Sequence, residues 1–240
     1  MFPYRVDNPL AGPVFATAII VALNVLVWIV VEGMGGEAQL VPALCNYGLI
    51  PASLLGQLAS GSTVALDEGL SCTVGNTPAW LTVLSSMFMH GGWFHLISNM
   101  WFLWLFGRNI EDVMGPARYS LFYLFAGLAA AAAQVLADPA SRLPMVGASG
   151  AISGVMGAYL VIFPKVRVHM WLFQGIFALR ITVPAWVMLG YWFALQLLGA
   201  NVGSLQAQGG GIAFAAHVGG FVVGLMVATV LKMRRSMSAV

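Results

Sequence analysis

The sequence predicts an all-α integral membrane protein, built as a bundle of six transmembrane helices with both termini on the cytoplasmic side. Three observations lead to this fold class. The 240-residue chain is 60% hydrophobic and only 8% charged, whereas a soluble domain has about 25% charged residues. Its apolar residues fall into six runs. Nine of its ten Lys and Arg residues lie on one side of the bundle that these runs define.

The six apolar runs set the expected spans, because about 17 to 25 helical residues cross the hydrocarbon core of a bilayer. The first begins after Arg5, but it is 18 residues long and no small-residue cleavage site follows it, so we interpret it as a retained helix and not as a signal peptide. The second and fourth runs are short and the others are adequate. In chain order the predicted spans are Val14–Val31, Gly92–Phe106, Tyr119–Ala137, Ala148–Phe163, Ile181–Leu198 and Ile212–Leu231.

The orientation follows from the basic residues, which gather on the cytoplasmic side of membrane proteins. An even number of spans places both termini on the same side. Arg142 is the only basic residue left for the other side. The cytoplasmic set consists of Arg5, Arg108, Arg118, Lys165, Arg167, Arg180, Lys232, Arg234 and Arg235.

A long polar loop, residues 32–86, is therefore expected outside. It carries both cysteines, Cys45 and Cys72, which can pair if the loop faces an oxidising compartment. Two unrelated thiols are the alternative. The stretch Pro51–Ser60 within this loop is a candidate for a short amphipathic segment at the interface. With no repeat and no separate soluble part in the sequence, residues 1–240 are expected to form one membrane domain.

Few polar side chains fall inside the predicted spans, and such groups are candidates for function because burying them is costly. Asn99 lies about seven residues below the outer end of the second span, roughly 10 Å deep. His217 lies six residues into the sixth span, roughly 9 Å deep. The short fourth span covers about 21 Å of a core about 30 Å thick, which places Ser149 at a similar depth. His95 is one turn above Asn99 on the same helix face.

Close helix packing is the competing interpretation of the same region. Small residues let transmembrane helices approach one another, and glycines surround Ser149 and follow His217. Taken alone, the glycine pattern favours packing. A serine, two histidines and an asparagine at one depth favour a functional site. The glycines are Gly147, Gly150, Gly154 and Gly157 on the fourth span, and Gly220 and Gly224 on the sixth.

Elimination then narrows the chemistry. No Asp or Glu follows Asp138 or lies inside a span, which argues against an aspartyl protease and a proton-coupled transporter. His90 and His95 are five residues apart without an intervening Glu, so the zinc-protease pattern is missing. No acidic residue lies near His217 in sequence, which makes a full Ser-His-Asp triad improbable. The remaining arrangement is a serine–histidine dyad.

Each role in acyl transfer has one candidate in such a dyad. Ser149 would be the nucleophile and His217 the general base that takes its proton. Three donors would stabilise the oxyanion: the Asn99 amide, the His95 ring and the Ser149 backbone N–H at its helix start. Gly147 and Gly150 beside the serine would let a substrate backbone approach. The irregular chain before Ser149 would dip into the membrane beside a water-filled cavity.

These motifs together resemble the rhomboid intramembrane serine proteases. The matching stretches are GASGAISG around Ser149, HGGWFHLISNM with His95 and Asn99, NIEDVMG after the second span, and AHVGGFVVG with His217. The similarity runs from about Trp80 to Leu231. The resemblance implies the same nucleophile, base and oxyanion donors, and a structural role for His90 in bonding loop backbone.

The resemblance also implies several features outside the dyad. Arg108 and Glu111 would form a structural ion-pair region in the cytoplasmic turn. The fifth span and the loop Gly199–Gly211 would form a mobile gate and cap. Many relatives carry an aromatic residue four positions after the nucleophile, stacked on the base histidine. Here that position is Ser153, which would leave the His217 ring less well packed or hydrogen-bond it.

The resulting hypothesis is an intramembrane serine endopeptidase that cleaves transmembrane segments of single-pass membrane proteins near the outer leaflet. Its expected partners are these substrates and the lipid bilayer, with no nucleic acid, no cofactor and no metal. It is expected in a bacterial-type inner membrane, with the active site opening to the outer side. Two alternatives are a non-catalytic protein that binds transmembrane helices, and a haem protein with His95 and His217 as axial ligands.

Overall fold

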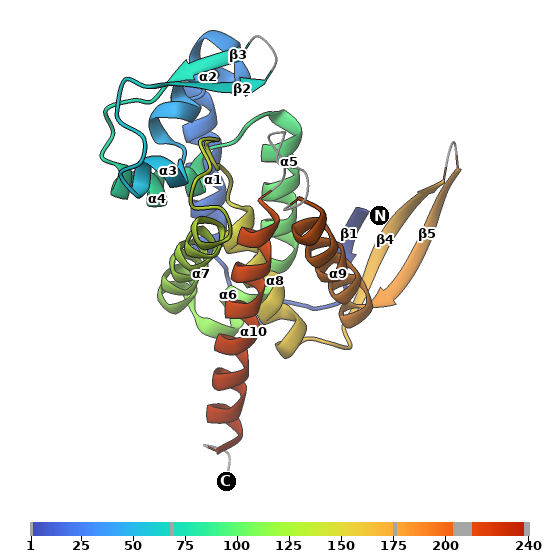
Figure 1. Ribbon diagram of the computed structural model, residues 1–240. Helices are drawn as coiled ribbons and strands as arrows, with labels where there is room; N and C mark the ends of the chain where they lie inside the picture. Colours follow the sequence, from blue (N-terminus) through green and yellow to red (C-terminus); the bar gives the residue numbers. More distant parts are fainter. Residues whose placement is uncertain (1, 68–69, 175–176, 204–212, 238–240) are drawn as a thin grey trace.

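The computed structural model describes residues 2–67, 70–174, 177–203 and 213–237. A bundle of helices forms the body of the molecule, and two small sheets lie at its periphery (Figure 1). The predicted helical class is therefore right for the bundle, but the sheets were not predicted. Their strands come from the N-terminal residues, the long loop and the connection before the fifth predicted span.

The helices of the bundle follow the predicted apolar runs, and five of the six begin within three residues of the expected position. They are α1 (Ala16–Val30), α5 (Trp93–Phe102), α7 (Pro116–Ala137), α8 (Ser149–Ile162), α9 (Ala185–Gly203) and α10 (Phe214–Met237). A π-helical turn, η3 (Leu103–Gly107), and α6 (Arg108–Met114) extend α5. Among the described residues, Pro116–Ala137 and Phe214–Met233 are long and apolar enough to cross a membrane.

The fifth span was predicted to begin at Ile181, which is four residues before the observed helix. Residues Ile181–Pro184 belong to strand β5 (Phe177–Pro184), and the helix begins only at Ala185. The strand pairs in an unbroken antiparallel register with β4 (Arg167–Gln174), from Arg167 opposite Pro184 onward. Hydropathy cannot separate the two elements, because an apolar strand leads directly into an apolar helix.

The β4–β5 hairpin joins the first residues of the chain in a three-stranded sheet. Strand β1 (Phe2–Val6) pairs antiparallel with β4, which gives the order β1-β4-β5. The indole N–H of Trp101 on α5 donates to the Pro3 carbonyl at 2.7 Å and ties the sheet to the bundle. Figure 1 shows the hairpin extending from the side of the bundle beside β1.

The long loop is folded into short elements at one end of the bundle (Figure 1). A disulfide joins Cys45 to Cys72, whose Cα atoms are 6.2 Å apart, within the usual range for a bridge. The predicted amphipathic stretch is helical only over Pro51–Leu54. The elements are η1 (Gly33–Gly35), α2 (Glu37–Tyr47), α3 (Pro51–Leu54), β2 (Thr63–Asp67), β3 (Leu70–Thr73), α4 (Ala79–Ser85) and η2 (Ser86–Phe88).

Helix α8 is enclosed by its neighbours, since all ten residues from Gly150 to Tyr159 are buried. Glycines make this possible. A Cβ on Gly220 or Gly224 of α10 would collide with the carbonyl oxygen of Gly150 or Gly154 of α8. The two helices therefore approach backbone to backbone, as small residues in membrane helices allow. The packing interpretation of the glycines is thus correct for these positions, and it does not compete with a functional one.

Glu111 has a different role from the expected ion pair with Arg108. Its buried carboxylate accepts the backbone N–H groups of Phe15, Ala16 and Thr17 at 2.7–2.8 Å. These are free donors at the start of α1, where a carboxylate is also favoured by the helix dipole. Arg108 instead lies over the Trp104 ring, 4.6 Å from its centroid. Glu111 on α6 therefore caps the start of α1.

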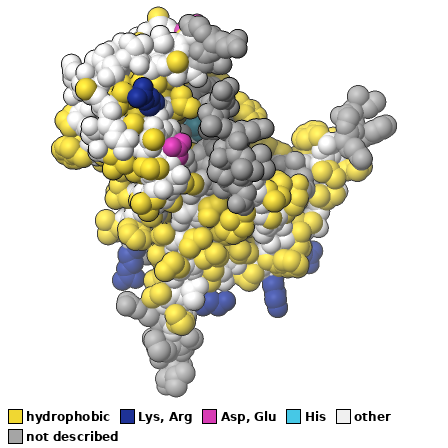
Figure 2. Space-filling view, in the orientation of Figure 1, with side chains coloured by type: hydrophobic (Ala, Val, Ile, Leu, Met, Phe, Trp, Pro, Cys, Tyr) yellow, Lys and Arg dark blue, Asp and Glu magenta, His cyan; other side chains and the backbone are white. Residues whose placement is uncertain are grey.

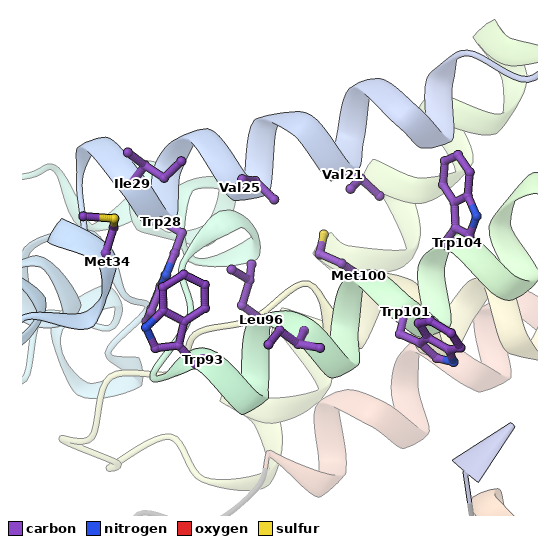
Figure 3. A pocket seen from close by; sticks show the side chains of 11 residues that line it. Val21, Val25, Trp28, Ile29, Met34, Trp93, Leu96, Met100, Trp101 and Trp104 are labelled. Atoms are coloured by element: carbon purple, nitrogen blue, oxygen red, sulfur yellow. The ribbon is translucent and has the colours of Figure 1, made fainter. Parts of the chain in front are cut away.

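The surface of the bundle matches a membrane protein. In Figure 2 apolar side chains cover the middle of the face shown, and Lys and Arg side chains gather near the lower end. A groove of about 450 Å³ lies between α1 and α5, with Trp93 at one end and Trp104 at the other (Figure 3). Its lining is apolar and includes none of the candidate site residues.

Candidate active site

Ser149 and His217 meet across the contact between α8 and α10. The Nε2 atom of His217 lies 2.8 Å from Oγ of Ser149, a hydrogen-bonding distance. Ser149 is the first residue of α8, and His217 lies in the first turn of α10. The backbone approach at Gly150, Gly154 and Gly220 brings the two helix starts together. The sequence predicted Ser149 and His217 at a similar depth, and in the structure their side chains are in direct contact.

The second ring nitrogen of His217 has a partner on a third helix. Nδ1 lies 2.8 Å from Oε1 of Gln196 on α9. Trp192, one turn earlier on α9, places its ring 5.9 Å from the His217 ring, measured between centroids. Both ring nitrogens of His217 are thus engaged in hydrogen bonds.

Ser153 does not hydrogen-bond the His217 ring, as one of the two expectations had it. Its hydroxyl donates to the Ser149 carbonyl at 2.6 Å, within the same helix. An aromatic ring approaches His217 from α9, where the Trp192 centroid lies 5.9 Å from that of His217 and the two planes are tilted by 37°.

The His95 ring presents a donor toward the serine. The backbone N–H of Gly91 donates to Nδ1 of His95 at 3.3 Å, so in the neutral ring the hydrogen resides on Nε2. A Cβ added to Gly147 would lie 2.8 Å from this Nε2 and 3.4 Å from Oγ of Ser149. The space left by the missing side chain of Gly147 therefore separates the donor from the serine hydroxyl. Gly147 has φ +128°, a conformation that glycine adopts without strain.

Asn99 supplies an unused donor. Its side chain is 7% exposed, and its Nδ2 is buried without a hydrogen-bond partner among the described residues. A buried amide without a partner is costly and is uncommon in folded proteins. The Nδ2 hydrogens of Asn99 are therefore available to an acceptor that enters the site. The Ser149 N–H, at the start of α8, likewise has no acceptor within its helix.

His90 is structural, but its bonding differs from the expectation. Its backbone N–H donates to Oε1 of Glu32 at 2.6 Å, and its ring packs edge-on against His95 at 5.0 Å. Glu32 follows α1 and is fully buried, although the sequence placed it among the outer-loop acids. Burial raises the pKa of Glu32 to about 7, partly opposed by the hydrogen bond from His90. Glu32 and His90 therefore anchor the chain that leads to His95.

A small cavity adjoins the serine. It has a volume of about 20 Å³ and is lined by Ser86, Gly147, Ser149 and Gly150 among others. This is enough for about one water molecule, which occupies roughly 10–15 Å³ by this measure. A cavity thus lies beside Ser149, with a volume close to that of one water molecule.

A family model for the Rhomboid domain matches residues 77–234, more than half of the 240-residue chain. The chain belongs to the rhomboid family. Rhomboid proteins are helical integral membrane proteins, and the family includes serine proteases. The matched region contains Ser149, His217, His95 and Asn99, and it begins after the disulfide-bonded loop.

Several curated rhomboid proteins are similar to this chain. "Rhomboid protease GluP" of Bacillus subtilis is 27% identical over 220 residues, which cover 92% of this chain and 35% of the relative. "Rhomboid protein 1, mitochondrial" of Saccharomyces cerevisiae is 28% identical over 151 residues, 61% of this chain and 40% of the relative. "Rhomboid-like protein 11, chloroplastic" of Arabidopsis thaliana is 37% identical over 87 residues, 36% of this chain and 31% of the relative. The chain thus spans well under half the length of each.

Two residues that contact His217 were not identified from the sequence. Gln196 and Trp192 lie inside an apolar run, and the run was interpreted only as a gate. A glutamine within a predicted span is the same signal that singled out Asn99, and it could have identified Gln196. No local signal marks Trp192, because aromatic residues are common in membrane helices. Of the predicted cap loop Gly199–Gly211, residues 204–211 lie outside the described part of the chain.

Proposed function

We propose that this rhomboid protein is an intramembrane serine endopeptidase that cleaves transmembrane segments of single-pass membrane proteins near the outer leaflet. The single observation that supports it most strongly is the 2.8 Å contact between Ser149 Oγ and His217 Nε2. Two hydrogen-bonded side chains from different helices, beside a small cavity, satisfy the first geometric requirement of nucleophilic catalysis.

In this proposal Ser149 attacks the carbonyl carbon of the scissile peptide bond while His217 Nε2 accepts the hydroxyl proton. The tetrahedral intermediate collapses when the same imidazole returns that proton to the leaving amine. An acyl ester on Ser149 remains. Water then attacks the ester with His217 again as base, and this step releases the carboxylic acid and restores the serine. The cavity beside Ser149 supports a route for that water.

The oxyanion is proposed to lie in the space between His95 and Ser149 that the missing side chain of Gly147 leaves open. The Nε2–H of His95, the Nδ2 amide of Asn99 and the Ser149 N–H are its proposed donors. Preorganised donors of this kind each contribute about 10²–10³-fold to the rate. The unpartnered Asn99 amide supports this assignment. Gly150 is proposed to support the site by allowing the close approach of α10.

We further propose that residues 1–240 form one membrane domain with six spans and cytoplasmic termini, in a bacterial-type inner membrane. The basic residues near the lower end in Figure 2 support this orientation. The dyad lies at the start of α8 and α10, which is the outer end of both helices in this topology. Cleavage would then occur toward the outer leaflet.

The test is cleavage of a fluorogenic transmembrane peptide by the purified protein in proteoliposomes. Ser149→Ala and His217→Ala should each reduce kcat by more than about 10³-fold, as for other serine nucleophiles and their bases. Ser120→Ala and His169→Ala are matched controls, because the Ser120 hydroxyl bonds the Pro116 carbonyl within α7 and His169 lies in the sheet. Mass spectrometry of the products would locate the cleaved bond.

A second readout avoids any dependence on the chosen peptide. A fluorophosphonate probe should label the wild-type protein at Ser149, and labelling should disappear in Ser149→Ala but persist in the Ser120→Ala control. Cleavage that survives Ser149→Ala contradicts the proposal. A wild-type protein that neither cleaves nor reacts with the probe would favour the alternative of a non-catalytic helix-binding protein.

A further inference from the structure

Gln196 of α9 contacts the proposed base from a helix that carries neither dyad residue. We infer that Gln196 is a positioning residue, which holds the His217 imidazole in the tautomer that can take the Ser149 proton. This inference rests on the proposed function. It extends the dyad to an arrangement in which a third side chain, a neutral amide, orients the base and links it to the placement of α9.

The hydrogen-bond chain determines the tautomer. The side-chain oxygen of Gln196 can only accept a hydrogen bond, so at 2.8 Å it requires a hydrogen on His217 Nδ1. A neutral imidazole carries one hydrogen, and Nε2 is therefore left as the acceptor. That nitrogen faces Ser149 Oγ at 2.8 Å. The two contacts are thus consistent with only one direction of proton transfer, from the serine to the histidine.

The other tautomer would be inactive. If the hydrogen resided on Nε2, the imidazole could donate to Ser149 but could not accept its proton. An amide acceptor at Nδ1 disfavours this tautomer, because it would leave the Gln196 oxygen facing a lone pair. Gln196 provides this acceptor without carrying a charge.

Helix α9 supplies both contacts to the far side of the ring. Trp192 and Gln196 are four residues apart and therefore lie on one helix face. The Trp192 ring lies 5.9 Å from the imidazole with the planes tilted by 37°, while Gln196 contacts Nδ1 at the ring edge. Hydrogen bonds weaken steeply beyond about 3.2 Å between heavy atoms. A displacement of α9 by about 1 Å would therefore release His217 while leaving the α8–α10 contact intact.

The test replaces the acceptor while keeping the shape of the side chain. Gln196→Met has similar length and volume but only a weak acceptor, and it should lower kcat by about 10–100-fold, the range for a side chain that orients a functional histidine. KM should stay within about twofold, since Gln196 is not proposed to contact substrate. Gln196→Glu restores an acceptor and should recover much of the loss.

The matched control is Gln134→Met. Gln134 lies on α7, and its side-chain oxygen accepts the backbone N–H of Ala216 at 3.3 Å, next to His217 but away from its ring. This variant carries the same chemical change near the same residue. It should leave kcat within a few-fold of the wild type and the tautomer unchanged.

A spectroscopic readout separates this inference from the proteolytic function. In protein labelled with ¹⁵N-histidine and assigned with His217→Gln, the wild type should show a protonated Nδ1 and an unprotonated Nε2 at residue 217. Gln196→Met should populate the other tautomer. The measurement needs no substrate and can be made in the Ser149→Ala background, so a protein without protease activity still tests it.

The outcomes are decisive in either direction. A wild-type spectrum with the hydrogen on Nε2 overturns the assignment, even if Gln196→Met fails to fold. An unchanged kcat in a folded Gln196→Met protein, with an unchanged tautomer, also overturns it. A fall in kcat with a shifted tautomer, recovery in Gln196→Glu and no effect in Gln134→Met would support it.

Discussion

Gly147→Ala probes the proposed oxyanion site directly, because this glycine separates the His95 ring from Ser149. The added methyl group would lie 2.8 Å from His95 Nε2 and 3.4 Å from Ser149 Oγ. It would therefore occupy the space where a substrate oxygen has to accept hydrogen bonds. The variant changes neither the nucleophile nor the base.

The expected magnitude follows from these distances. Ordinary contacts between non-bonded heavy atoms are about 3.5–4.0 Å, so the His95 ring has to retreat by about 0.7 Å or more. Loss of one oxyanion donor lowers kcat by about 10²–10³-fold, equivalent to about 2.7–4 kcal/mol. The backbone also contributes, since φ +128° is strained for alanine by about 1–3 kcal/mol.

Gly115→Ala separates the two effects. Gly115 also has a positive φ of +78°, but nothing lies within 4 Å of its added Cβ. This control carries backbone strain without an obstruction near Ser149. Both variants should lose thermal stability, measured by intrinsic fluorescence during heating. Only Gly147→Ala should lose peptide cleavage in proteoliposomes.

The reasoning would be refuted by one result in particular. If folded Gly147→Ala retains kcat within about threefold of Gly115→Ala, which is less than the loss of any single oxyanion donor, then the space beside Gly147 is not where the oxyanion forms. A parallel loss of activity in both variants would point to strain as the cause and would equally contradict the proposed steric block.

Three further predictions concern other parts of the molecule. Asn99→Ala should lower kcat by about 10²–10³-fold. It should not lower the melting temperature, because the Nδ2 group that it removes is buried and unpartnered. A loss of stability with full activity would contradict the proposed role of Asn99. Burial raises the pKa of Glu32 to about 7, so the folded state retains a proton that the unfolded chain releases, and stability should fall as pH rises from about 5 to 7. Glu32→Gln should flatten this dependence in melting experiments, whereas Glu37→Gln, at an exposed position, should not. Reduction of the Cys45–Cys72 disulfide should make the loop of residues 32–86 more sensitive to proteolysis, because the bridge closes a loop with a sequence separation of 27. An unchanged digestion pattern would show that the bridge contributes little to the stability of this loop.

The helices could be predicted because apolar composition is a local property. Five of the six runs begin close to the observed helices, and the exception, at Ile181, is an apolar strand that runs into an apolar helix. The sheet could not be predicted in the same way. In this sheet Phe2–Val6 pairs with Arg167–Gln174. The two segments are far apart in the sequence, and neither carries a local signal that identifies its partner.

The acidic residues show the same limit. Their rarity in the sequence directed attention to a dyad. Burial, however, depends on what folds over a residue, and Glu32 and Glu111 are buried partners of backbone N–H groups instead of surface charges. The sequence placed one in a loop and the other in an ion pair, since it contains no information on which distant N–H groups need an acceptor.

The sequence by itself determined the membrane character of this rhomboid protein, the approximate positions of its main helices and the small set of polar side chains in the candidate site. Each of these follows from residue type and spacing along a single helix. Only the tertiary structure decided that Ser149 and His217 touch, and that Gln196 and Trp192 reach the imidazole from α9. These contacts depend on how closely and at what rotation three helices pack, which the glycines of α8 and α10 permit but do not specify.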